Sequence, residues 1–122
     1  MAIVASLLAS IADPSNAREV EIPVPSDPNA RYYLLNLVPM DGATLQIESR
    51  REGTSGISFS VRLVDCAAGT YDAIYSAYDG EPRSEVFPIL DASPNMGLLT
   101  DQSISWYVSR FACTKLGMAM GW

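Results

Sequence analysis

The stretch ISFSVRLVDC, residues 57–66, decides the fold of this 122-residue chain. Its apolar and polar residues alternate with a period of two, which predicts a β-strand. The apolar positions are Ile57, Phe59, Val61 and Leu63, and Ser58, Ser60, Arg62 and Val64 lie between them. We expect the four apolar side chains to face one way and to pack against a helix through Val108 and Phe111.

A second stretch, SISWYVSRFAC at residues 103–113, predicts that helix. Its apolar residues recur at helical spacing and form one stripe, which consists of Ile104, Tyr107, Val108 and Phe111. Asp101 or Thr100 can accept a hydrogen bond from the first free amides, so either can start the helix, which we expect to end near Cys113. A bridge from Cys113 to Cys66 would tie the helix to the sheet, with Cα atoms about 4.4 to 6.8 Å apart.

The chain from residue 18 to residue 122 predicts a single α+β domain. We expect an antiparallel meander of about five strands, with the C-terminal helix packed on one face. The expected strands are residues 31–38, 43–51, 57–66, 70–78 and 83–90. Asp41-Gly42 predicts a tight hairpin after the first strand, and Asp79-Gly80-Glu81-Pro82 predicts a turn before the last.

Residues 1–17 fit two interpretations. The apolar run AIVASLLASIA at residues 2–12 is followed by Ser15 and Ala17, which suit the minus-three and minus-one positions of an export cleavage site. No Lys or Arg precedes this run, whereas signal peptides begin with positive charge. The same residues also form an amphipathic stripe, with apolar positions Ile3, Val4, Leu7, Leu8 and Ile11. The segment is therefore either a signal-peptide remnant or a short N-terminal helix.

The net charge of −6 is unevenly distributed. Seven acids lie between Leu63 and Asp101 against one base, Arg83, while the rest of the chain carries seven acids and seven bases. This excess disfavours nucleic acid as a partner and favours a protein with a basic surface. It also fits a solvated acidic face that only keeps the protein in solution. The sequence contains no run of about 18 apolar residues, which is the length that a membrane-spanning helix needs.

The residue inventory argues against catalysis and against a cofactor. The chain has no histidine and one lysine, Lys115, so a catalytic thiol would lack a base to ionise it. Two cysteines without histidine cannot complete a four-ligand zinc site, and Asp79-Gly80-Glu81 does not match the alternating ligands of a calcium loop. Cys66 and Cys113 therefore form a disulfide if the protein is exported, or two separate buried thiols if it is cytosolic.

Tyrosines and acids gather in the second half of the chain and predict a protein-binding surface. Tyrosine offers a large contact area at a low entropic cost, and the neighbouring carboxylates would attract a basic partner. The expected binding residues are Tyr71, Asp72, Tyr75, Tyr78, Asp79, Glu81 and Glu85. Some of these tyrosines can equally belong to the core.

Short motifs around both cysteines resemble the surface-adhesin protein E family. These are Val64-Asp65-Cys66 followed by Tyr71, and the segment 102–107 leading to Ala112-Cys113. The resemblance covers about residues 31–113 in the order of elements, and it implies an exported antiparallel sheet with a C-terminal helix, paired cysteines and adhesion to host matrix proteins in some members. No cysteine precedes Cys66, so the lipid attachment of membrane-anchored members is not expected.

Two functions follow from these observations. The first is a small exported bacterial protein, periplasmic or secreted, that acts as a non-catalytic protein-binding, adhesin-like or accessory module. The second is a cytosolic acidic inhibitor, for example phage-encoded, that occupies a basic site on a host protein. The oxidation state of Cys66 and Cys113 distinguishes them, because stable disulfides belong to oxidising compartments.

Overall fold

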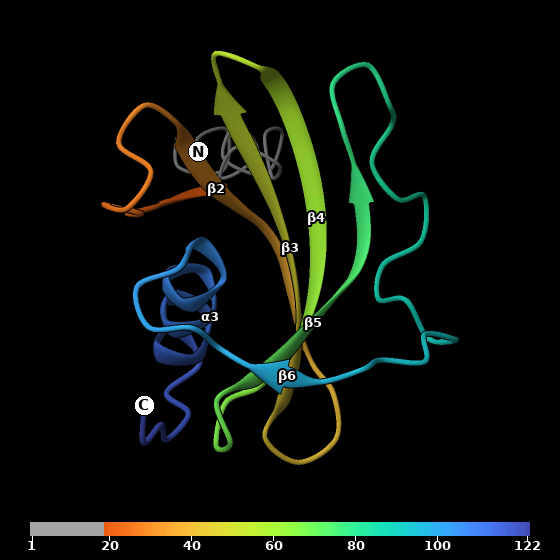
Figure 1. Ribbon diagram of the computed structural model, residues 1–122. Helices are drawn as coiled ribbons and strands as arrows, with labels where there is room; N and C mark the ends of the chain where they lie inside the picture. The colour runs from red at the N-terminus through yellow and green to blue at the C-terminus, as the bar shows by residue number, and fades with distance from the viewer. Residues whose placement is uncertain (1–18) are drawn as a thin grey trace, which may run out of the picture.

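The computed structural model describes residues 19–122, which form a six-stranded antiparallel sheet and one helix, α3 (Figure 1). The strands follow one another in the order of the sequence: β1 (Val20–Ile22), β2 (Arg31–Pro39), β3 (Thr44–Gly53), β4 (Gly56–Asp65), β5 (Thr70–Ala77) and β6 (Gly97–Leu98), and α3 spans Ile104–Lys115. The predicted α+β fold, with a meander and a C-terminal helix, is confirmed. The sheet has six strands instead of five, and both interpretations of residues 1–17 lie outside the described residues.

The two additional strands are short and lie at the edges of the sheet. β1 pairs with residues 32–34 of β2, and β6 pairs with Thr70 and Tyr71 of β5. Each is too short for a period-two pattern, since β1 has three residues and β6 has two. Pro23 follows β1 and Pro94 precedes β6, so both strands lie in stretches that read as irregular in the sequence.

The predicted strand at residues 83–90 is wrong, because this stretch has no strand pairing. Pro82 and Pro88 lack the N–H groups that a ladder needs. The hydroxyl of Ser84 donates to the carbonyl of Val86 at 2.8 Å and accepts from its N–H at 3.3 Å, and this local turn competes with strand pairing. The chain between β5 and β6 is instead a long irregular segment.

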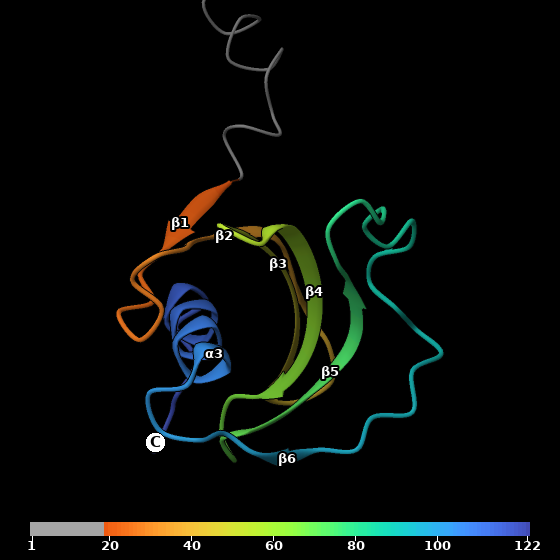
Figure 2. The same ribbon diagram turned by 45° about the horizontal axis from the view of Figure 1, so that its top comes forward.

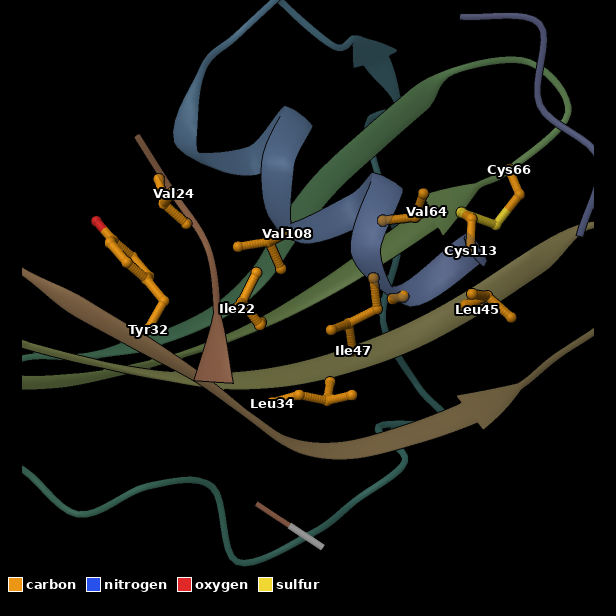
Figure 3. Close-up of a cluster of buried hydrophobic side chains, with 11 residues drawn as sticks. Ile22, Val24, Tyr32, Leu34, Leu45, Ile47, Val64, Cys66, Val108 and Cys113 are labelled. Atoms are coloured by element: carbon orange, nitrogen blue, oxygen red, sulfur yellow. A yellow bond between two sulfur atoms is a disulfide. The ribbon is translucent and has the colours of Figure 1, made fainter. Parts of the chain in front are cut away.

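The sheet curves around α3, which lies on its concave side, while the segment between β5 and β6 runs outside the curve (Figure 2). The main core fills the space between α3 and the sheet (Figure 3). Its buried residues are Ile22, Val24, Tyr32, Leu34, Leu45, Ile47, Val64, Cys66, Val108, Ala112 and Cys113.

The apolar residues of β4 that alternate at positions 57–63 face away from α3. In the register of the sheet, Val61 lies opposite Glu48 and Leu63 lies opposite Gln46, whereas Val64 lies opposite the core residue Leu45. The four residues do share one face, but their expected packing against Val108 and Phe111 is wrong. Arg62 and Val64, which alternate with them, face the helix, and Val64 belongs to the core beneath it.

The predicted disulfide is present. Cys66 and Cys113 are bonded, with Cα atoms 5.9 Å apart, and both residues are fully buried. The bond joins the end of β4 to the last turn of α3, so it ties the helix to the sheet (Figure 3). A disulfide of this kind is typical of proteins from oxidising compartments.

The ends of α3 differ slightly from the prediction. Its N-cap is Ser103, whose hydroxyl accepts from the N–H of Trp106, and neither Thr100 nor Asp101 has this position. At the other end, the N–H of Met118 donates to the carbonyl of Cys113, and Gly117 adopts a φ of +68°, as in a glycine-terminated helix. No helix among the described residues is long and apolar enough to cross a membrane.

Candidate protein-binding surface

The chain leaves β5 through a tight turn at residues 78–81. The N–H of Glu81 donates to the carbonyl of Tyr78 at 2.8 Å, and the carboxylate of Glu81 accepts from the N–H of Tyr78 at 2.7 Å. Gly80 has a φ of +84°, a conformation that favours glycine. The turn starts a segment that we call the acidic loop, residues 78–91, because it contains Asp79, Glu81, Glu85 and Asp91.

An ion pair holds the acidic loop to the outer face of the sheet. The guanidinium of Arg83 donates to both carboxylate oxygens of Glu48, at 2.9 and 2.6 Å, and also lies over the ring of Phe59. Glu48 is 1% exposed and accepts a further bond from the side-chain amide of Asn36 at 2.7 Å. The single base of the acidic half is therefore engaged by Glu48, although its side chain is 44% exposed, and it does not pair with an acid of the loop itself.

A side-chain amide provides the second anchor of the acidic loop. Gln46 is 1% exposed, and its amide accepts from the N–H of Ile89 at 2.8 Å and donates to the carbonyl of the same residue. Both main-chain groups of Ile89 are thus paired, as they would be in a strand. The loop follows a fixed path although it has no regular structure.

Three of the seven predicted binding residues are half-buried and make contacts within the fold. Tyr71 packs against the main core under α3. On the other face, the hydroxyl of Tyr75 donates to the carbonyl of Pro82 at 3.0 Å, and the carboxylate of Asp72 accepts from the N–H of Asn95 at 2.8 Å. The structure therefore separates Tyr71 from the other six and places Asp72 and Tyr75 under the segment that follows β5.

The other four predicted residues, Tyr78, Asp79, Glu81 and Glu85, are exposed together on the acidic loop. Two-thirds of the surface of Tyr78 is accessible, and Asp79 lies against Gly56 at the tip of the β3–β4 hairpin. A hollow of about 330 Å³ opens at this corner. Its walls are Arg51, Ser55, Gly56, Ile57, Ser58, Tyr78 and Asp79.

Sequence reasoning missed the apolar part of this surface. Val86, Leu90 and Leu98 are 60%, 78% and 80% exposed, and Leu90 is followed by the exposed acid Asp91. The prediction placed Val86 and Leu90 in a sheet strand, where one of the two faces would have covered them. The prolines at 82, 88 and 94 were the signal against a strand and in favour of an exposed loop.

The edge of the sheet lies beside the acidic loop. β6 pairs with β5 only at Thr70 and Tyr71, so within residues 19–122 the outer edge of β5 from Asp72 to Ala77 has no strand partner. An open edge of this kind can accept an extended segment of another protein through main-chain hydrogen bonds.

A second hollow, of about 510 Å³, lies along the outer side of α3 and has different chemistry. Its lining is mainly apolar and aromatic, with Arg110 and Lys115 as its charged members. The guanidinium of Arg110 lies between the rings of Trp106 and Trp122, so part of this lining is already engaged within the chain. The acidic loop and α3, whose residues form most of this hollow, lie on opposite sides of the sheet (Figure 2).

Comparison with protein-family models, curated proteins and solved structures finds no match to this chain. Within residues 19–122, no three metal-ligating side chains lie close enough together to hold an ion.

Proposed function

We propose that this chain is a small exported bacterial protein that acts as a non-catalytic protein-binding module, and that it binds a basic partner through the acidic loop. The observation that carries this proposal is the coincidence of exposed acids and exposed apolar side chains. Among the described residues, six large apolar side chains are exposed, and four of them, Tyr78, Val86, Leu90 and Leu98, lie within residues 78–98. The four acids of the acidic loop lie among them and are also exposed.

Each half of this combination has a physical function in binding. Exposed apolar side chains that cluster on one segment mark interaction sites more often than scattered ones do. The acids steer a basic partner toward the loop and increase the rate of association. The two anchors at Glu48 and Gln46 fix the loop before binding, which reduces the entropy lost when the complex forms.

The disulfide supports the exported form of this proposal over the cytosolic inhibitor. Periplasm and extracellular space keep such bonds oxidised, and the adhesin-like resemblance agrees with that compartment. Intact mass of the protein from its native host, with and without reductant, tests this point. A loss of two hydrogens relative to the reduced protein supports export, and two free thiols in the native material would favour the inhibitor.

Photocross-linking in the native host tests the binding surface. A benzophenone amino acid at Val86 should form an adduct with one protein, whereas the same group at Thr114, exposed on α3, should not. The cross-linked partner can then be purified and its association rate measured at several salt concentrations. We expect the rate to fall as salt screens charges over about 8 to 10 Å.

Charge reversal provides the matched control for this measurement. Asp79→Lys with Glu81→Lys should reduce the association rate about tenfold at low salt, because electrostatic steering depends on local charge. Glu21→Lys with Asp41→Lys changes the total charge equally at exposed positions on β1 and the β2–β3 connection. If the control pair slows association as much as the loop pair does, or if the rate does not respond to salt, the acidic loop is not the binding surface.

A further inference from the structure

Arg62 carries a buried positive charge on the helix-facing side of β4. Its side chain is 8% exposed, and its guanidinium donates from Nε to the hydroxyl of Ser105 and from Nη1 to the hydroxyl of Ser49, both at 3.0 Å. Both partners are neutral. Burial therefore lowers the pKa of the Arg62 guanidinium, and only the phenols of Tyr71 and Tyr32 act in the opposite direction.

The other arginines within residues 19–122 have different surroundings. Each of Arg31, Arg50, Arg51 and Arg83 lies within 4.0 Å of a carboxylate oxygen. Arg110 stacks on two tryptophan rings. Arg62 has no carboxylate partner in this part of the chain, although it is the most buried of the six. A buried charge without a counter-charge is strongly unfavourable, so proteins normally pair it.

The groups around Arg62 are rich in hydrogen-bond donors. The hydroxyls of Ser49 and Ser105 accept from the guanidinium, and in the described residues neither hydroxyl donates its own proton. Ser109, one turn further along α3, is fully buried, and its hydroxyl has no hydrogen-bond partner. Because side chains lean toward the N-terminus of a helix, the hydroxyl of Ser109 leans toward Ser105.

The backbone adds positive potential at the same place. Ser105 lies in the first turn of α3, where free N–H groups and the helix dipole favour an anion, and this turn contains no acidic residue. A row of hydroxyls connects the cluster with solvent. Three serines lie opposite one another on β3, β4 and β5: Ser49 is buried, Ser60 is half-buried and Ser76 is exposed.

We propose that the chain binds a small monovalent anion, such as chloride or a formate-sized carboxylate, between Arg62, Ser49 and Ser105. The anion supplies the missing counter-charge, and it accepts bonds from the guanidinium and from the two free hydroxyl protons. Arg62 and Ser49 are 8% and 3% exposed, so the site admits a ligand of only a few atoms. This site lies on the opposite face of the sheet from the acidic loop, so it is independent of the proposed function.

Thermal unfolding of the full chain at constant ionic strength tests the site. Sodium chloride and sodium formate are compared with sodium gluconate, whose anion is too large to enter, and with phosphate as a larger inorganic anion. Chloride at ten times its dissociation constant should shift the folding equilibrium about tenfold, which raises the melting temperature by roughly 4 to 8 °C and saturates at higher concentration. Equal melting temperatures in chloride, formate and gluconate would overturn the proposal.

Substitutions locate the effect. Arg62→Met should abolish the chloride dependence, and Arg31→Met, which changes an exposed arginine, should retain it. If Arg62→Met does not fold, Ser105→Ala and Ser49→Ala decide the question, because each removes one donor and should raise the chloride midpoint several-fold. An unchanged midpoint in both serine variants, or a chloride response that persists in Arg62→Met, would show that the anion binds elsewhere.

Discussion

Replacement of Arg83 by methionine should destabilise the protein and release the acidic loop. Glu48 is 1% exposed and receives three hydrogen bonds, two from Arg83 and one from Asn36. Arg83→Met removes both charged donors and keeps most of the side-chain volume over Phe59. The carboxylate of Glu48 then remains in the interior with only the amide of Asn36 as a donor.

The expected loss follows from two limits. Removal of one partner of a fully buried ion pair costs about 3 to 5 kcal/mol, whereas an exposed pair contributes at most about 1 kcal/mol. The side chain of Arg83 is 44% exposed, so water can replace part of its interaction with Glu48 when the loop moves away. We therefore expect Arg83→Met to lower the free energy of unfolding by about 2 kcal/mol, close to the value of hydrogen bonds to a charged group.

Urea denaturation measures the free energy of unfolding, and hydrogen exchange measures how often the acidic loop opens. The amide of Ile89 should exchange faster in Arg83→Met, because the loop that presents it to Gln46 has lost its ionic anchor. In a Glu48→Gln background, Arg83→Met should cost less than about 0.5 kcal/mol, since no buried charge is left unpaired. Arg31→Met, at a 70% exposed side chain, is the matched control and should stay within about 0.5 kcal/mol of wild type.

Equal stabilities of Arg83→Met and Arg31→Met would contradict this prediction. An equal cost of Arg83→Met with and without Glu48 would also contradict it, because the ion pair would then contribute nothing and the loop would be held by other contacts.

Two further measurements test the core. Replacement of both Cys66 and Cys113 by alanine should lower the free energy of unfolding by about 4 kcal/mol, because the bond closes a loop with a sequence separation of 47 residues. A loss below about 1 kcal/mol, measured by urea denaturation, would contradict this prediction. Burial and a hydrogen bond to Asp27 raise the pKa of Tyr32 from 10.0 to about 12, so the folded protein keeps a proton that the unfolded chain releases, and stability should fall as the pH rises from about 10 to about 12. Tyr32→Phe should reduce this slope, whereas Tyr78→Phe, at a largely exposed phenol, should not.

The strands with local periodicity could be predicted from the sequence. Residues 43–51, 57–66 and 70–78 were expected, and β3, β4 and β5 occupy nearly these ranges. The hairpin at Asp41-Gly42 is also present, but only Gly42 has a positive φ, and Met40 to Ala43 form a longer connection than the expected pair. Short-range patterns indicate where a chain extends or turns, because neighbouring residues determine both.

The environment of each sheet face could not be predicted in this way. Gln46 and Glu48 alternate with apolar residues in β3, a pattern typical of a strand with one face in water, yet both are 1% exposed. Their partners Ile89 and Arg83 lie 43 and 35 residues further along the chain, in a segment that was taken for a strand. Alternation shows which residues share a face, but only the tertiary fold shows which face a helix covers and which face a loop covers.

The acidic residues of the candidate surface could be predicted from the sequence, whereas its exposed apolar side chains were missed. Charge density can be counted along the sequence, so Asp79, Glu81 and Glu85 were found correctly as neighbours, and all three are exposed. Tyr71 contacts the core although Tyr75 lies on the outer face, because the register of β5 against β4 shifts between these two residues, and a shift by one residue reverses the faces. The side chains of Val86 and Leu90 are exposed because residues 83–90, the expected fifth strand, form a loop.

The two faces of the sheet thus have different functions: the concave face stabilises the fold, and the outer face holds the acidic loop in place. On the concave face, the disulfide and the apolar core hold α3, and none of their residues lies in the acidic loop. On the outer face, Glu48 and Gln46 pair with the acidic loop in the way that a further strand would, but through side chains. Because these bonds fix the middle of the loop and leave its acids and apolar tips outside, the loop can be rigid and still expose the groups that a partner would contact. A strand in the same place would have directed half of those side chains into the sheet.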